Sequence, residues 1–202
     1  MRLYGVTTAG KNPDSDKVFL FTRIMKLNSF GIFKKQGMKE SIKFISRTTV
    51  GSVEKGSRCS TPHEELMIHF LVSKKDFLVF YAFTGLEYPR RLAYKFLEEV
   101  RDAFDQNLGE SWKEINKDNN LKVPEISKLF KKYEKADKVD NLVMANLKVE
   151  KATDIVSKNL RELLERQGEL DGLVKESEDL SKKSKAFYKN SKKVNKKCCN
   201  LI

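Results

Sequence analysis

A regular apolar seam runs through the last third of this 202-residue chain, and one arginine, Arg166, interrupts it near its middle. The seam steps along the chain at alternating spacings of three and four residues, and eleven of its sixteen positions are apolar. A heptad register kept over this length predicts a left-handed coiled coil. A single amphipathic helix that docks on the rest of the chain is the alternative, which explains the apolar stripe but not the strict register. The seam positions are Leu142, Ala145, Val149, Ala152, Val156, Asn159, Leu163, Arg166, Leu170, Leu173, Ser177, Leu180, Ser184, Phe187, Ser191 and Val194.

Arg166 indicates what the partner helices must supply. A guanidinium in a helical core is costly unless its five donors find acceptors, so partner helices are expected to bring oxygen atoms to this layer. Gly168 and Gly172 each cost roughly 1 kcal/mol in an isolated helix. We therefore expect a segment that is loose alone and orders on binding.

The aromatic core belongs to the N-terminal half, where eleven of the 13 phenylalanines precede residue 110. Apolar runs and turn residues predict strands at 2–8, 17–25, 65–73 and 77–84, and apolar periodicity predicts helices at 36–54, 89–104 and 124–132. This order is typical of an α+β fold with an antiparallel sheet and helices on its faces. Residues 1–133 are expected to form one domain, followed by a charged linker at 134–141.

The C-terminal tail combines positive charge with two adjacent cysteines. Eight lysines and no acidic residue lie between Ser181 and Lys197, within a formal net charge of +12. Such a run favours an anionic membrane surface, although a solvated charge run is the alternative. The last four residues, from Cys199 to Ile202, have the form of a prenylation box, and Cys198 offers a second thiol for acylation. No apolar stretch is long enough to span a bilayer, so any membrane attachment is expected to come from this tail.

Several function classes are disfavoured by what the sequence lacks. No phosphate-binding glycine loop is present, which argues against a prenylated small GTPase. The lysines come without a nucleic-acid-binding signature. Cys59 and His63 are predicted to be loop residues, and His69 a packed or edge histidine, so we expect no catalytic residue, no metal site and no cofactor. Three cysteines and no signal peptide indicate a reducing cytosol.

Four parts of the chain resemble a known family. The run from Glu165 to Leu170, with its flanking layers and Asn159, resembles the central layer of R-SNARE proteins. The C-terminal tail is similar to that of prenylated, Ykt-type longin R-SNAREs. These are synaptobrevin-like vesicle fusion proteins. The runs Phe30-Gly31-Ile32-Phe33 and Glu87-Tyr88-Pro89 resemble the longin domain of that subfamily.

The resemblance implies a fold and a division of the chain. A longin, or profilin-like, domain with a five-stranded antiparallel sheet and flanking helices would occupy residues 1–133. A helical SNARE coiled-coil motif would occupy 142–197, and a lipidation tail 198–202. Arg166 would be the central layer and the other seam residues the remaining core layers. The resemblance would place Phe30, Phe33 and Phe44 on an autoinhibitory longin surface. Ordinary core packing explains these three residues equally well.

The resemblance also implies a non-enzymatic function and its partners. The chain would pair with three Q-SNARE helices and drive the fusion of intracellular vesicles. Prenyltransferase and palmitoylation machinery would act on the tail: Cys199 would be prenylated, and methylated after Asn200, Leu201 and Ile202 are removed, and Cys198 would be palmitoylated. The protein would cycle between the cytosol and the cytoplasmic face of Golgi, ER and vesicle membranes. A lipid-anchored coiled-coil scaffold outside fusion is the alternative function.

Overall fold

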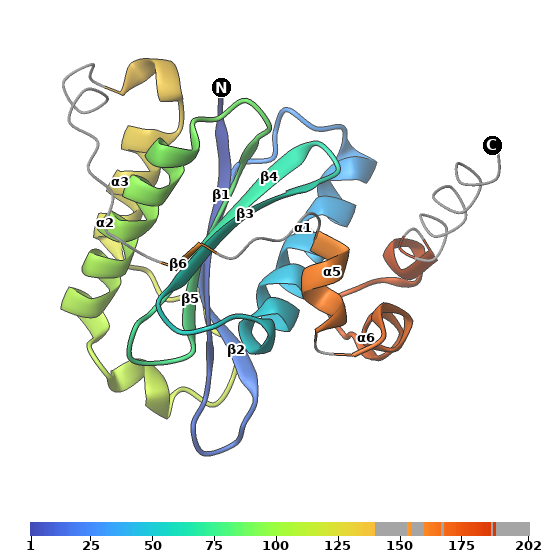
Figure 1. Ribbon diagram of the computed structural model, residues 1–202. Coiled ribbons are helices and arrows are strands. Elements are labelled where there is room, and N and C mark those ends of the chain that lie inside the picture. The colour runs from blue at the N-terminus through green and yellow to red at the C-terminus, as the bar shows by residue number, and fades with distance from the viewer. Residues whose placement is uncertain (140–152, 155–159, 167, 187, 189–202) are drawn as a thin grey trace.

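A mixed β-sheet forms the centre of the computed structural model (Figure 1). The structure describes residues 1–139, 153–154, 160–166, 168–186 and 188. The strands are β1 (Leu3–Lys11), β2 (Val18–Met25), β3 (Ser57–His63), β4 (Leu66–Val72), β5 (Leu78–Gly85) and β6 (Thr153–Asp154). Their order across the sheet is β2-β1-β5-β4-β3-β6. The first five pair antiparallel, as predicted, and the short β6 joins the edge parallel to β3.

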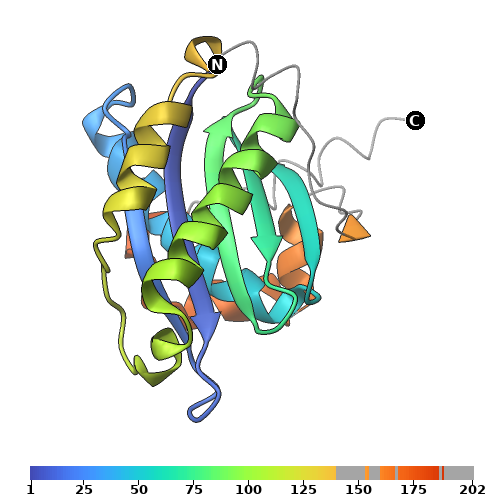
Figure 2. The same ribbon diagram turned by 90° about the vertical axis from the view of Figure 1, so that its left-hand side faces the viewer.

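Helices cover both faces of this sheet. One face carries α2 (Arg90–Leu108) and α3 (Pro124–Tyr133), and the opposite face carries α1 (Ile32–Thr48) (Figures 1 and 2). The central strand β5 shows why both faces need cover, because successive side chains of a strand point to opposite faces. Phe80 packs with the α2 side, whereas Tyr81 and Val79 pack with the α1 side. The result is a continuous apolar strand of the kind found in sheets covered on both faces.

The helix predicted at 36–54 is shifted in the structure. It begins at Ile32 and ends at Thr48, where a short 3-10 helix, η1 (Thr49–Ser52), follows. β-branched residues lose side-chain freedom in a helix, which favours an end at this point. The hydroxyl of Thr49 also bonds the carbonyl oxygen of Ile45 at 2.7 Å and the Tyr81 hydroxyl at 2.7 Å. The start of the η1 turn is therefore fixed to the sheet.

Strand β3 has no counterpart among the strands predicted from the residues themselves. Its sequence, Ser-Arg-Cys-Ser-Thr-Pro-His, lacks the apolar alternation of a half-buried strand. It forms because β4 pairs with it from Arg58, opposite Leu71, to His63, opposite Leu66. Pro62 is tolerated because, among the described residues, β6 pairs only with Ser57 and Arg58 and leaves β3 an edge strand at Pro62.

Residues 134–139 of the predicted linker belong to the folded domain. The amide of Leu3 donates to the carbonyl oxygen of Glu134 at 2.9 Å, and the Glu134 carboxylate pairs with Arg2 at 2.8 Å. Ala136 and Val139 are buried against the α2 side. Because charged residues surround Ala136 and Val139, the composition of this segment does not predict that these two side chains are buried.

The connection between α2 and α3 closes the free edge of β2. Leu121 donates its amide to the carbonyl oxygen of Phe21 at 2.6 Å, and Asp118 accepts the amide of Leu20 at 3.0 Å. An edge strand with unpaired backbone groups is prone to aggregation, so this segment protects it. Trp112, in η2 (Ser111–Glu114), is buried beside Phe21, with ring centroids 5.5 Å apart.

Gly10 on β1 leaves the space that Trp112 needs. A Cβ atom at this position would lie 2.8 Å from a ring carbon of Phe21 and 2.9 Å from a ring carbon of Trp112. We predict that Gly10→Ala lowers the free energy of unfolding by about 1–3 kcal/mol, because neither ring has room to move. Urea denaturation followed by Trp112 fluorescence measures this change.

Gly37→Ala is the matched control for this prediction. The nearest atom to a Cβ at Gly37 is the Ser184 hydroxyl at 3.9 Å, an ordinary contact, and the position lies inside α1. Alanine should stabilise the helix there by about 0.4–1 kcal/mol. Equal stability of wild type and Gly10→Ala would contradict the packing described.

Candidate functional site

The α1 side of the sheet receives the C-terminal part of the chain. Helices α5 (Leu160–Glu165) and α6 (Leu170–Glu176) lie on this side, and the residues that follow α6 reach the outer surface of α1 (Figure 1). We call the described residues between 160 and 188 the docked segment. Its apolar side chains belong to the same cluster as the core between α1 and the sheet.

The apolar contacts of the docked segment are extensive. Its helix α5 lies against η1 and β3. Full burial of one large aliphatic side chain contributes about 1.5–3 kcal/mol relative to exposure. The buried apolar residues of the segment are Leu160, Leu163, Leu164, Leu170, Val174, Leu180 and Tyr188.

Tyr188 is the aromatic anchor of the docked segment. Its ring packs edge-on against Phe44 of α1, with centroids 5.4 Å apart, and stacks on His63 of β3 at 5.9 Å. Burial lowers the pKa of His63 to about 4. A protonated imidazole is therefore disfavoured beneath this tyrosine.

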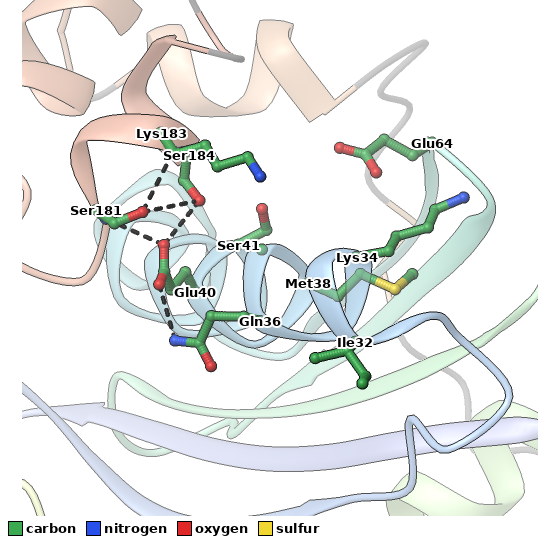
Figure 3. Close-up of a pocket in the computed structure, with 11 residues that line it drawn as sticks. Ile32, Lys34, Gln36, Met38, Glu40, Ser41, Glu64, Ser181, Lys183 and Ser184 are labelled. Atoms are coloured by element: carbon green, nitrogen blue, oxygen red, sulfur yellow. Dashed lines mark hydrogen bonds between the residues drawn. The ribbon is translucent and has the colours of Figure 1, made fainter.

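Glu40 on α1 binds the backbone and a side chain of the docked segment. Its carboxylate accepts the Ser181 amide at 3.0 Å and the Ser184 hydroxyl at 2.7 Å (Figure 3). Burial opposes the charged form, but the hydrogen bonds from Ser184, Ser181 and Gln36 outweigh it and lower the pKa of Glu40 to about 2. The charged carboxylate therefore supports docking.

A cavity of about 400 Å³ lies between α1 and the docked segment (Figure 3). Ile32 and Met38 supply its apolar floor, while Lys34 and Glu64 stand on one side and Ser184 on the other. Ile32 is 86% exposed, which is unusual for a large aliphatic side chain in a helix. The cavity can therefore accept an apolar chain at its mouth.

The structure describes only part of the predicted seam. Leu163, Leu170, Leu180 and Ser184 are buried against the domain, and Leu173 and Ser177 are partly buried. Arg166 lies in a turn and is exposed. The other seam positions lie outside the described residues: Leu142, Ala145, Val149, Ala152, Val156, Asn159, Phe187, Ser191 and Val194.

In the described residues the predicted SNARE motif is not one continuous helix. After α5 the backbone at Gly168 has a φ of +150°, a conformation that L side chains rarely adopt, and Glu169 is extended. Ser177 is extended again after α6. The weak helix propensity at Gly168 and Gly172 thus allows short helices that each bury a side on the domain.

The predicted longin surface is only partly described. Phe44 contacts Tyr188, whereas Phe30 packs edge-on against Tyr4 with centroids 5.0 Å apart. The side chain of Phe33 lies outside the described residues, as do Cys198, Cys199 and the three residues Asn200, Leu201 and Ile202.

Sequence reasoning missed several contact residues. Leu160, Leu164 and Val174 are apolar but lie off the heptad register, and this second stripe was a signal that could have found them. Glu40 and His63 gave no such signal, because a polar side chain on a helix or strand surface is ordinary.

The ionisable side chains and the helices of the described part of the chain bear on metal binding and on membrane insertion. No group of three or more histidine, cysteine, aspartate or glutamate side chains could hold a metal ion there. His69 is buried and bonds Ser60 at 2.7 Å and Thr84 at 3.0 Å. Among the same residues, none of the helices has the length and apolarity needed to cross a bilayer.

Comparison with known proteins agrees with this two-part organisation. The Longin family model, which describes a regulated-SNARE-like domain, matches residues 27–129. The Synaptobrevin family model matches residues 141–201. The synaptobrevin match covers the seam, Arg166 and most of the tail.

Similar proteins come from distant eukaryotes. The synaptobrevin homolog YKT6 of Dictyostelium discoideum is 31% identical over 205 residues and covers 100% of both chains. The VAMP-like protein YKT61 of Arabidopsis thaliana is 29% identical over 190 residues, or 94% of each chain. The synaptobrevin homolog YKT6 of Candida glabrata is 28% identical over 207 residues and also covers 100% of both chains. With a longin domain, a synaptobrevin region and full-length similarity of this kind, the chain belongs to the YKT6-type synaptobrevin homologues, a family of longin-domain SNARE proteins.

Proposed function

We propose that this protein is an R-SNARE that pairs with three Q-SNARE helices to fuse vesicle membranes, and that its longin domain inhibits this pairing when residues 160–188 are docked. One observation carries the proposal. The seam residues Leu163, Leu170 and Leu180, which the partner helices would need, are the residues buried on the longin domain. One apolar side chain cannot be buried in both places, so docking and assembly compete for the same residues.

Arg166 supports the same competition. It is exposed in the docked arrangement, where no buried charge has to be satisfied. In a four-helix bundle the same guanidinium would enter the core and bind glutamine side chains from the partners. Assembly on an opposing membrane would then release free energy close to the anchored end of the chain and draw the two bilayers together.

Lipid attachment at Cys199, with Cys198 as a second acylation site, supplies the membrane anchor in this proposal. One lipid chain holds a protein on a membrane only marginally, whereas a second chain or a basic segment makes the attachment durable. The eight lysines between Ser181 and Lys197 favour an anionic surface, and palmitoylation would make residence on the membrane reversible.

The cavity beside α1 is a candidate shelter for the prenyl chain in the docked form. Ile32 and Met38 provide an apolar lining. From Tyr188 to Cys199 there are 199 − 188 = 11 residues, which reach at most about 36–40 Å when extended. The lipid of Cys199 is therefore within reach of a cavity that the segment itself helps to build.

The decisive test of function is assembly with purified Q-SNARE helices. Wild type should form a parallel four-helix complex that resists heat, and Arg166→Leu should lose about tenfold or more of its preference for glutamine over leucine in the partner layer. Replacing the arginine would leave buried glutamine amides unsatisfied, at about 1–3 kcal/mol for each group. Circular dichroism melting of complexes with glutamine or leucine partners measures this preference.

The docked arrangement is the control for Arg166→Leu. Because Arg166 is exposed there, the substitution should change the stability of the free protein by less than about 0.5 kcal/mol. Unchanged selectivity for glutamine partners would argue for a lipid-anchored scaffold instead of an R-SNARE.

We expect Cys199→Ser to abolish membrane attachment. In cell fractionation the variant should be found wholly in the soluble fraction. No prenyl chain can form on it, and Cys198 cannot hold the protein on a membrane without that first lipid. Cys198→Ser is the matched control and should bind membranes weakly and reversibly, as one lipid chain does. Persistent pelleting of Cys199→Ser with membranes would refute the anchor.

Acid should weaken docking through His63. Its pKa is about 4 in the docked arrangement and should return toward the ordinary 6.5 once Tyr188 leaves. The docked form therefore binds fewer protons, so docking is strongest above pH 6.5 and loses up to about tenfold per pH unit as the pH falls toward 4. Glu40, with a pKa of about 2, acts in the same sense at lower pH, whereas burial raises the pKa of Glu64, which acts in the opposite sense.

Titration of the histidine ring protons by NMR tests this linkage in the full chain. In Tyr188→Ala the pKa of His63 should rise toward 6.5, while that of His69, which burial and the nearby Arg90 lower to about 3, should stay where it is. A His63 pKa near 6.5 in wild type would mean that Tyr188 does not cover it.

A further inference from the structure

Arg47, near the end of α1, makes five hydrogen bonds to three different parts of the chain. Its Nε donates to Asp179 at 2.7 Å, and one terminal nitrogen donates to the carbonyl oxygen of Val18 at 2.6 Å and to Asp118 at 3.2 Å. The other terminal nitrogen donates to Asp118 at 2.7 Å and to Asp179 at 3.3 Å. A guanidinium has five N–H donors, so the docked arrangement satisfies Arg47 completely.

Two of the three acceptors belong to the folded domain and hold Arg47 in place without the docked segment. Val18 begins β2, and Asp118 lies in the connection that closes the β2 edge, where it also accepts the Leu20 amide. Burial opposes the charged form of Asp118, but the hydrogen bonds from Arg47 and Leu20 lower its pKa. The guanidinium therefore faces the docked segment with Nε and one terminal nitrogen already oriented for a carboxylate.

The geometry points to Arg47 as an ion-pair latch, which holds the docked segment on the longin domain by binding the carboxylate of Asp179. The paired carboxylate is well covered, because the side chain of Asp179 is only 12% exposed. A bidentate, partly buried pair of this kind is stronger than an ordinary surface salt bridge.

Asp179 is suited to a latch because it lies beside the seam and not in it. The neighbouring Leu180 is the seam residue, and Asp179 would face away from the core of a helical bundle. The latch can therefore be removed without changing any core layer. Its role as an inhibitory contact rests on the proposed function, but its role in docking does not.

The two carboxylates around Arg47 mean that removing Arg47 and removing Asp179 should weaken docking to different extents. Asp118 and Asp179 both bond the same guanidinium, so Arg47→Gln would leave two negative charges facing each other. That variant loses an attraction and gains a repulsion. Asp179→Asn loses only the attraction, because Arg47 keeps Asp118 and Val18.

Hydrogen exchange in the full chain at pH 7 tests the latch. The amide of Ser181 reports docking, since it donates to the Glu40 carboxylate of α1 at 3.0 Å. In low salt we expect exchange to be about tenfold faster in Asp179→Asn and faster still in Arg47→Gln. Adding Asp179→Asn to Arg47→Gln should slow exchange again, because it removes the repulsion.

Salt and a control variant separate the latch from a general loss of charge. Most of the difference should persist in 1 M salt, which screens exposed charges beyond about 3 Å but affects a partly buried contact pair much less. Lys132→Gln removes an ion pair with Glu99 between α2 and α3 and should leave the exchange of Ser181 unchanged. Wild-type exchange rates in both Asp179→Asn and Arg47→Gln, or strictly additive effects in the double variant, would overturn the latch.

The same variants, tested for assembly with Q-SNARE helices, distinguish the role of the latch in docking from its role in inhibition. Faster exchange together with faster assembly with Q-SNARE helices supports both. Faster exchange with an unchanged rate of assembly would leave the latch standing and refute autoinhibition. Asp179→Asn carries its substitution outside the longin domain, so its result does not depend on the folding of that domain.

Discussion

The docked arrangement depends on the burial of one set of apolar side chains, and the proposed function gives the same side chains a second destination in a helical bundle. Leu163, Leu170 and Leu180 belong to a heptad seam, and they also complete the core between α1 and the sheet. Apolar burial is not directional, so the same leucines can serve a domain surface or a helical bundle. In the proposed function, the exclusion between docking and assembly follows from this shared use.

Polar contacts give the docked arrangement its register and its sensitivity to conditions. Glu40 binds the backbone at Ser181, and Arg47 binds Asp179, so each contact is satisfied at one alignment only. His63 stacks on Tyr188, and because burial lowers the pKa of His63, its protonation is predicted to favour release. These contacts involve charged or titratable groups and therefore respond to pH, whereas the buried leucines do not titrate.

Local patterns predicted the strongest elements of the fold. The apolar runs of β4 and β5 and the amphipathic helix α2 lie close to where the sequence placed them, because their residues agree with their environment. Strand β3 was missed because its pairing with β4 creates it, and residues 134–139 were read as a linker because charged neighbours surround Ala136 and Val139. Arg47 could not be recognised as a contact residue, since its partners come from three separate segments.

The sequence alone determined the family, through the seam around Arg166 and the order of strands and helices that precedes it. Those features can be read along the chain, because each strand, helix and heptad step is set by residues that are close in sequence. Only the tertiary structure decided that the described part of the seam is divided into short helices on the α1 side, with its leucines buried and Arg166 exposed. The physical reason is that a heptad pattern specifies which side chains must be buried, but not which surface buries them.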